Sequence, residues 1–322
     1  MAQLETILEV RNLKKHFHVE KGTLHAVDGV SLAIRKNEIV GLVGESGCGK
    51  STLGRTLVGL YDKTSGEVYY DGERLPTSYT PADYKKFSRQ IQMIFQDPYS
   101  SLNPRMTIRE IVAEGPLIHG LWKNSEVEQK VAFWLKRVGL HREHMSRYPH
   151  EFSGGQRQRI GIARALALEP KLIVCDEPIS ALDVSVQAQV VNLLQDLKET
   201  MGLTLVFIAH DLSMVRYISD RMAVMYLGSL VELGTSNEVY FRPLHPYTQS
   251  LVASNPKADP AVERAREHAP PRGEIPSPVN LKPGCRFAGR CPKALSHCST
   301  VDPVWREVKK DHFVACHLFA DS

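Results

Sequence analysis

The sequence predicts an α/β protein with a parallel core sheet, an antiparallel β subdomain, a helical insertion and a small cysteine-rich C-terminal extension. Three observations lead to this prediction. A short apolar run, EIVGLVG, ends in glycines and leads directly into a helical pattern. Strand and helix patterns then alternate between residues 171 and 211, which is typical of a parallel sheet. Four of the six cysteines lie after residue 284.

The composition is that of a globular protein rather than a nucleic-acid arm or a disordered tail. The chain has 322 residues, of which 43% are hydrophobic and 24% charged, with a net charge of +4. The N-terminus lacks the features of a secretory signal. No apolar run approaches the roughly 20 residues that span a bilayer. If the protein works at a membrane, we expect other chains to supply the spans.

The remaining elements follow from periodicity and from proline. Residues 7–35 alternate apolar and polar side chains, which predicts antiparallel strands over one face of a core. Residues 107–168 are mostly helical in pattern, and we place a helical subdomain at about 97–168. Seven prolines between residues 254 and 284 predict a linker or a wrapped loop. We therefore expect a main domain over 1–253 and a proline-rich linker with an extension over 254–322.

The first motif with chemistry is GESGCGKS, residues 44–51, which matches the phosphate-loop pattern G-x-x-x-x-G-K-S/T. Glycines let successive backbone N–H groups wrap a triphosphate, and the helix N-terminus adds its positive dipole end. A plain glycine-rich turn is the alternative, and the strand before and helix after argue against it. Lys50 is expected to reach the β and γ phosphates, and the Ser51 hydroxyl to ligate Mg²⁺. The expected ATP-binding residues here are Gly44, Glu45, Ser46, Gly47, Cys48, Gly49, Lys50, Ser51 and Thr52.

An acidic pair follows the apolar run LIVC at residues 172–175. A buried strand there delivers Asp176 and Glu177 to its C-terminal edge, where ligands bind in parallel sheets. Asp176 is expected to hold Mg²⁺, and Glu177 to accept a proton from an attacking water. Such a pair alone is weak evidence, because most are solvated caps. Together with an upstream phosphate loop it indicates nucleotide hydrolysis.

A second anion-binding device is FSGGQRQR, residues 152–159. A serine and two glycines precede a helical pattern, so another helix N-terminus offers free N–H groups and a hydroxyl. An ordinary N-cap at Ser153 is the simpler interpretation and is locally correct. An N-cap alone does not explain why this segment occurs in one chain with the phosphate loop and the acidic pair, in this order. The residues of this segment expected to meet a phosphate are Ser153, Gly154, Gly155 and Gln156.

Taken together, these motifs resemble the ATP-binding cassette (ABC) ATPases, a P-loop NTPase family. Further landmarks of that family are Gln96 in MIFQDP, the D-loop SALD from Ser180 to Asp183, and His210 in FIAHD. The resemblance covers residues 7 to about 250 and makes 1–253 a nucleotide-binding domain. It implies that two cassettes meet head to tail, with each ATP between the phosphate loop of one and the signature of the other.

The resemblance also implies roles for single residues. Glu177 would be the general base, and His210 would touch the γ-phosphate. Gln96 would meet Mg²⁺ and the lytic water, so the Mg²⁺ site would comprise Ser51, Gln96 and Asp176. Phe17 is our candidate for stacking on adenine, with an aromatic packed in the core as the alternative.

LHPYT at 244–248, GEIPSP at 273–278 and the tail cysteines resemble the ATPase subunits of oligopeptide and dipeptide permeases. This implies peptide import, with residues 97–111 docking on membrane subunits. The implied partners are a paralogous ATPase, two integral membrane permease subunits and an extracytoplasmic peptide-binding protein, without nucleic acid. The implied location is peripheral, on the cytoplasmic face of the cell membrane. Similar ATPases energise the import of nickel complexes and oligosaccharides, so these are alternative cargoes to peptides.

Three other classes of ATPase fit less well. Cassette ATPases of DNA repair interrupt the domain with long coiled coils, and no sustained heptad pattern appears here. Translation factors of this type carry two cassettes in one chain, whereas this chain has one. P-loop kinases and GTPases lack the SGGQ signature. A transport ATPase is therefore the favoured interpretation.

The tail cysteines, Cys285, Cys291, Cys298 and Cys316, match neither zinc-ribbon nor common ferredoxin spacings. Scattered structural cysteines would leave the clustering unexplained, and a disulfide pair conflicts with a cytosolic enzyme. Four thiolates suit zinc or an iron–sulfur cluster, and the permease ATPases are associated with a 4Fe–4S cluster in this tail. We expect such a cluster, with a structural or regulatory role, and zinc as the alternative because nearby histidines can replace a ligand.

Overall fold

The computed structural model describes residues 5–254 and 276–320, so most of the expected linker lies outside the described residues. An antiparallel sheet of four strands has the order β2-β1-β4-β5. Its strands turn alternate side chains inward, and Leu13 of β1 lies opposite Val30 of β2, both fully buried. The antiparallel strands expected over residues 7–35 are therefore confirmed. The bounds are β1 Thr6–Val19, β2 Gly22–Arg35, β4 Ser65–Tyr70 and β5 Glu73–Arg74.

The core sheet is mixed and has the order β11-β12-β10-β9-β3-β8-β7-β6. Strands β6, β7, β8, β3 and β9 run parallel, and the remaining neighbours are antiparallel. The central strands β3, β7 and β8 are buried at every position, as expected for a sheet covered on both faces. The bounds are β3 Ile39–Val43, β6 Ile91–Ile94, β7 Leu172–Asp176, β8 Thr204–Ile208, β9 Arg221–Tyr226 and β10 Ser229–Thr235.

Helix α1 (Lys50–Leu57) lies between the two sheets and contacts β2, β7 and β8. Its Gly54 allows this close approach, because an added Cβ would come within 2.9 Å of Ile208 Cδ1 and 3.0 Å of Val174 Cγ1. This packing fixes the helix N-terminus at the carboxyl edge of the parallel strands. The other helices beside the core sheet are α6 Val184–Met201, α7 Leu212–Ile218, α8 Ser236–Phe241 and α9 Pro246–Ser254.

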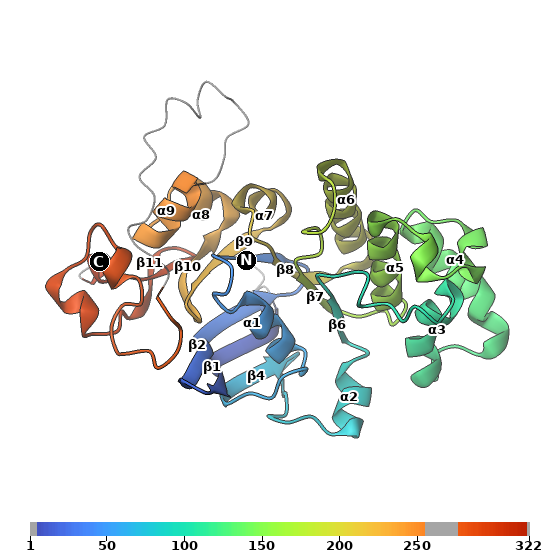
Figure 1. The fold of residues 1–322 in the computed structure, drawn as a ribbon, viewed down its shortest axis with the longest axis horizontal. Helices are drawn as coiled ribbons and strands as arrows, with labels where there is room; N and C mark the ends of the chain where they lie inside the picture. The colour runs from blue at the N-terminus through green and yellow to red at the C-terminus, as the bar shows by residue number, and fades with distance from the viewer. Residues whose placement is uncertain (1–4, 255–275, 321–322) are drawn as a thin grey trace.

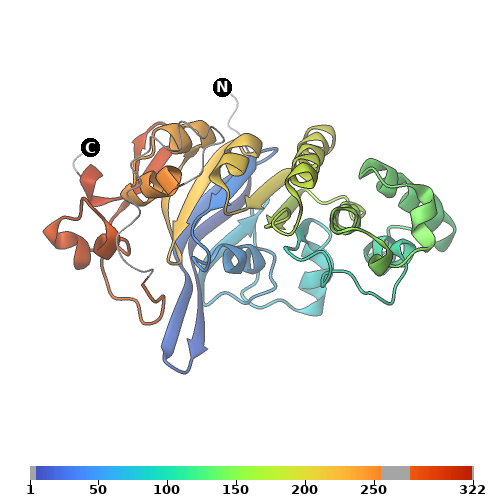
Figure 2. The same ribbon diagram turned by 45° about the horizontal axis from the view of Figure 1, so that its top comes forward.

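The segment between β6 and β7 is helical and lies at the opposite end of the molecule from the C-terminal extension (Figures 1 and 2). Its helices pack through fully buried Val112, Leu135 and Ile162. In the described part of the chain, no helix has the length and apolar character needed to cross a membrane. The helices of this segment are α3 Ile108–Ile118, α4 Val127–Arg137 and α5 Gly154–Leu166, with 3-10 turns at Asn124–Glu126, Arg142–Ser146 and Pro149–Glu151. Helix α2 Pro81–Phe87 precedes β6.

The C-terminal extension continues the core sheet. Its hairpin of β11 (Trp305–Lys309) and β12 (His312–Ala315) joins the edge, where β12 pairs with β10. Sequence analysis assigned no strands here, because these short strands depend on a distant partner. Fully buried Glu232 of β10 accepts a 2.8 Å hydrogen bond from His312 Nε2, which anchors β12. The extension also has 3-10 turns at Ala288–Arg290, Ser296–Ser299 and His317–Phe319.

Candidate nucleotide-binding and catalytic site

A cavity of about 300 Å³ lies where the β1–β2 hairpin faces the start of α1. Gly49 (φ 106°) permits the loop to pass close beneath β2, because a Cβ there would lie 2.0 Å from the carbonyl oxygen of Ala26. The sequence-predicted residues that line the cavity are Phe17, Ser46, Gly47, Gly49, Lys50, Ser51, Thr52, Gln96 and Glu177.

Lys50 is at the centre of this loop. Its side chain is buried, and Nζ donates hydrogen bonds to the carbonyl oxygens of Gly44 at 2.8 Å and Glu45 at 3.1 Å. Cys48 is buried and is not among the residues that line the cavity, and burial raises the pKa of its thiol. The loop therefore turns backbone groups and one cation toward the cavity, which is the arrangement that anions require.

Ser51 and Asp176 form the candidate Mg²⁺ site. Ser51 Oγ donates a 2.6 Å hydrogen bond to Asp176 Oδ1, which joins the first turn of α1 to the end of β7. Asp176 is fully buried, and within the described residues its Oδ2 has no hydrogen-bond partner, with only Arg55 nearby at 3.8 Å. A hydroxyl and a carboxylate with a free oxygen are the hard donors that Mg²⁺ prefers. These residues fit the ion.

Gln96 and His210 both approach Glu177. The Gln96 amide donates a 2.9 Å hydrogen bond to Glu177 Oε2, and His210 Nδ1 lies 3.9 Å from the same oxygen. The three residues come together because β6, β7 and β8 are parallel neighbours, so the segments that follow them begin at the same edge of the sheet. His210 is mostly exposed and lines a neighbouring cavity that also reaches Glu177 and Ser180.

Phe17 lines the same cavity as Glu177. Tyr61 meets its ring edge-on with 5.5 Å between centroids, and Lys15 Nζ lies 4.6 Å from its centre. The ring is only half-buried and lines the cavity, so it is available to a flat ligand group.

The signature residues lie apart from this cavity. Exposed Ser153 caps α5, where its hydroxyl accepts from the Gln156 N–H at 3.4 Å and Gln156 Oε1 accepts from the Ser153 N–H at 3.0 Å. Gly155 leaves room for α6, since a Cβ would lie 2.4 Å from Val186 Cγ1. In the D-loop, Ser180 donates to the Glu177 carbonyl oxygen, and exposed Asp183 precedes α6. Among the described residues of one chain, the signature segment at the start of α5 therefore does not reach the cavity beside the phosphate loop.

The sequence did not predict that several further residues lie near the site. Tyr247 belongs to the LHPYT motif, yet nothing in the sequence indicates that its hydroxyl accepts from the Glu45 N–H at 2.9 Å. Arg290 lies inside the cysteine-rich run and bonds the side chain of Glu45. Other cavity residues that the sequence did not indicate are Leu24, His25, Ala26, Gly228 and Pro278.

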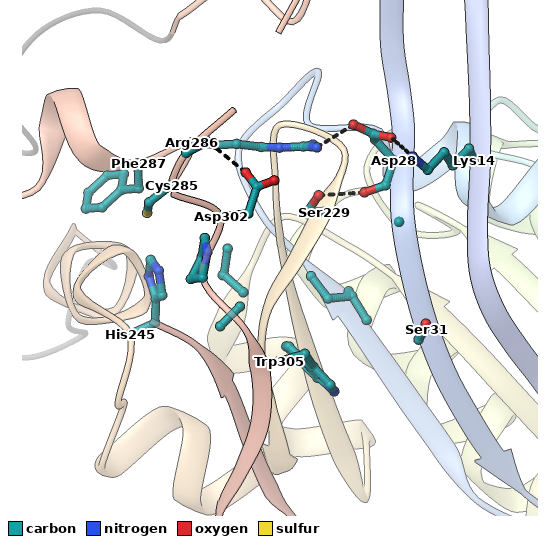
Figure 3. A pocket seen from close by; sticks show the side chains of 16 residues that line it. Lys14, Asp28, Ser31, Ser229, His245, Cys285, Arg286, Phe287, Asp302 and Trp305 are labelled. Atoms are coloured by element: carbon teal, nitrogen blue, oxygen red, sulfur yellow. Dashed lines mark hydrogen bonds and ion pairs between the residues drawn. The ribbon is translucent and has the colours of Figure 1, made fainter. Parts of the chain in front are cut away.

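The four tail cysteines show no arrangement typical of a metal or cluster site among the described residues. Burial raises the pKa of Cys285 to about 11, with smaller contributions from the other three thiols. Among the described residues, however, no three tail cysteine or histidine donor atoms come within 4.8 Å of one another, as zinc bonds of about 2.3 Å need. The extension is held instead by strand pairing and by two arginines. Arg286 reaches Asp28 on β2 (Figure 3), and Arg290 reaches Glu45 in the phosphate loop. The structure thus gives no support for iron–sulfur or zinc.

Comparison with known proteins agrees with this geometry. A family model described as ABC transporter matches residues 27–180. A second, described as oligopeptide/dipeptide transporter, C-terminal region, matches residues 231–298. Among solved structures, the dimeric post-hydrolysis state of the ATP-binding cassette MJ0796 bound to ADP and Pi is similar with a TM-score of 0.66 and 29% identity, covering 71% of this chain and 99% of that one. The expected cassette fold is confirmed.

Relatives match nearly the whole chain. The oligopeptide transport ATP-binding protein OppF of Bacillus subtilis (strain 168) is 54% identical over 313 residues, which is 97% of this chain and 96% of that protein. OppF of Escherichia coli (strain K12) is 52% identical over 323 residues, again 97% of this chain and 96% of the relative. With the phosphate loop, acidic pair and signature all present, this chain belongs to the oligopeptide transport ATP-binding proteins of the ABC transporter family.

Proposed function

We propose that this chain is the ATP-hydrolysing subunit of a peptide importer. One observation carries the proposal: the Ser51–Asp176 pair and the Gln96–Glu177 pair meet beside the phosphate loop at one edge of the sheet. When bound, Mg²⁺ neutralises charge on the phosphates. Lys50 binds the phosphates, Gln96 orients the attacking water, and Glu177 accepts its proton. We propose His210 as the contact to the γ-phosphate and Phe17 as the adenine platform.

The second half of each ATP site comes from another cassette in this proposal. The exposed signature at Ser153 and the exposed D-loop at Asp183 lack a partner surface among the described residues, which supports completion by a paralogous ATPase. ATP then favours the closed pair and hydrolysis releases it, which alternates two conformations of the membrane subunits. Residues 97–111 dock on those subunits at the cytoplasmic face of the membrane. We retain 1–253 as the nucleotide-binding domain and 254–322 as the extension.

Peptide cargo is favoured over nickel or oligosaccharides because the relatives are named as oligopeptide transport proteins. The test reconstitutes this chain with its membrane subunits, its paralogous ATPase and its binding protein in liposomes. Peptides delivered by the binding protein are expected to stimulate ATP hydrolysis and to accumulate inside. Stimulation by nickel complexes or oligosaccharides, with none by peptides, would replace the cargo. No hydrolysis in the full assembly would overturn the function.

The cluster proposed from the tail cysteines is decided by a separate measurement. Only the clustering of four cysteines in the sequence supports it. Anaerobic purification with visible absorption and metal analysis is the test. Stoichiometric iron with absorption near that of iron–sulfur proteins would retain the proposal, whereas colourless protein without iron would remove it.

A further inference from the structure

The C-terminal extension reaches back to the phosphate loop. Arg290, at the end of a 3-10 turn between two of the tail cysteines, makes a two-pronged contact with Glu45. Its Nη1 donates to Glu45 Oε2 at 2.9 Å and its Nη2 to Oε1 at 3.1 Å. The side chain of Arg290 is 7% exposed and that of Glu45 is 23% exposed, so the pair is largely shielded from water. Paired donors of this kind fix both the position and the orientation of a carboxylate.

Glu45 is held at its backbone as well. The hydroxyl of Tyr247 accepts a hydrogen bond from the Glu45 N–H at 2.9 Å. Tyr247 is fully buried, and its ring packs against Tyr226 and Phe287 at 4.5 and 5.4 Å between centroids. The partners of Glu45 thus come from 202 and 245 residues further along the chain. Contacts this distant define the phosphate loop only in the folded protein.

The charge of Glu45 is a problem for nucleotide binding unless it is paired. The residue lies within the loop that is to accept a triphosphate, although it does not itself line the cavity, and unpaired like charges repel one another in a partly buried site. The guanidinium of Arg290 cancels this charge. Hydrogen bonding to Glu45 raises the pKa of Arg290 above its ordinary value, so the guanidinium stays charged at every physiological pH.

The extension is also tied to the β1–β2 hairpin, part of which lines the nucleotide cavity. Figure 3 shows Arg286 reaching from the extension to Asp28 on β2, with a contact of 2.5 Å. Asn280 accepts from the Thr23 N–H at 2.9 Å and donates to the Lys21 carbonyl oxygen at 2.9 Å. Pro278 itself lines the nucleotide cavity. The extension therefore contacts both the β1–β2 hairpin and the phosphate loop.

We propose that Arg290 is a positioning residue for ATP binding, which holds the phosphate loop through Glu45 and neutralises that carboxylate. This inference rests on the nucleotide site proposed above. It gives the extension a part in nucleotide affinity that does not depend on any metal at the cysteines.

The test measures nucleotide affinity with a fluorescent ATP analogue, together with KM and kcat of the assembled transporter. Arg290→Met is expected to raise Kd and KM about tenfold, with kcat within about twofold of wild type, because the unpaired Glu45 repels the phosphates. The double variant Arg290→Met/Glu45→Gln is expected to recover to within about threefold, because the repelling charge is gone. Arg290→Lys is expected to lie between, since a single ammonium keeps the charge without the two-pronged contact.

Arg306→Met is the matched control. Arg306 donates to carbonyl oxygens of Phe319 and Ala320 within the extension and does not contact the loop, so wild-type affinity is expected. Wild-type affinity in folded Arg290→Met would overturn the inference, as would a defect of equal size in the double variant. If the wild-type protein itself bound no ATP, the proposed function would fail instead.

Discussion

Gln96 and Glu177 are joined by a 2.9 Å hydrogen bond between residues 81 positions apart, because β6 and β7 are parallel neighbours that end at the same edge. The amide is the donor, so Glu177 presents its carboxylate as an acceptor. A carboxylate oriented in this way is ready to take a proton from water. The pair therefore joins the residue that we propose to position the water with the residue that we propose as its base.

Glu177→Gln is expected to lower kcat for ATP hydrolysis by about 10²- to 10⁴-fold, because an amide does not accept the proton of the attacking water. ATP affinity is expected to remain, since the phosphate loop is unchanged. Phosphate release and analogue binding measure the two quantities. Glu199→Gln, at an exposed position of α6, is the control. Undiminished phosphate release from Glu177→Gln would assign the base elsewhere.

Ser51→Ala is expected to raise the Mg²⁺ concentration for half-maximal hydrolysis about tenfold, because a ligand hydroxyl is removed. The variant also loses the 2.6 Å bond and leaves buried Asp176 without that partner, which costs about 1–3 kcal/mol of stability. Mg²⁺ titrations of the ATPase rate provide the measurement. Ser51→Thr keeps the hydroxyl and should need the same Mg²⁺ concentration for half-maximal hydrolysis as wild type. An equal rise of that concentration in both variants would argue against Ser51 as a Mg²⁺ ligand.

Ser153→Asp separates the capping role of Ser153 from its proposed contact with the partner's ATP. Aspartate is as good an N-cap as serine, so the unfolding midpoint is expected to stay unchanged. The new negative charge faces the position proposed for a phosphate, so hydrolysis in the assembled pair should fall at least tenfold. Ser153→Asn caps without charge and should keep more activity. Equal activities of the two variants would contradict phosphate contact at this helix end.

His245 makes stability depend on pH. Burial lowers its pKa from 6.5 to about 3, and its Nδ1 accepts from the Tyr247 N–H at 3.0 Å. Between pH 6.5 and 3 the unfolded chain binds a proton that the folded chain does not. Stability from this group is therefore complete above pH 6.5 and is lost as pH falls, by about 1.4 kcal/mol per unit.

The contribution of His245 to the pH dependence of stability is measured by urea unfolding of wild type and His245→Asn at pH 7.5 and 5.5. Asparagine offers an acceptor oxygen in place of Nδ1 and does not titrate. The free energy of unfolding of His245→Asn should therefore fall less on acidification than that of wild type. The expected difference in the two pH responses is about 1.4 kcal/mol, which corresponds to the interval from pH 6.5 to 5.5. Equal responses would show that His245 is protonated in the folded state at pH 5.5.

The sequence by itself determined the cassette fold and the local motifs. The phosphate loop, the acidic pair after β7 and the capped signature helix are contiguous stretches, and their backbone conformation follows from glycines, apolar runs and capping residues within them. The roles assigned to Gln96, His210 and Phe17 came from family resemblance and stay predictions.

Only the tertiary structure decided what the C-terminal extension touches. Clustered cysteines suggested a separate metal-held unit, but β12 pairs with β10, and Arg290 reaches Glu45. Periodicity and composition report on neighbours within a helix turn or a strand pair, whereas these contacts join residues 82 and 245 positions apart. Their geometry depends on the completed sheet edge and on burial among Tyr226, Tyr247 and Phe287, which no local pattern encodes.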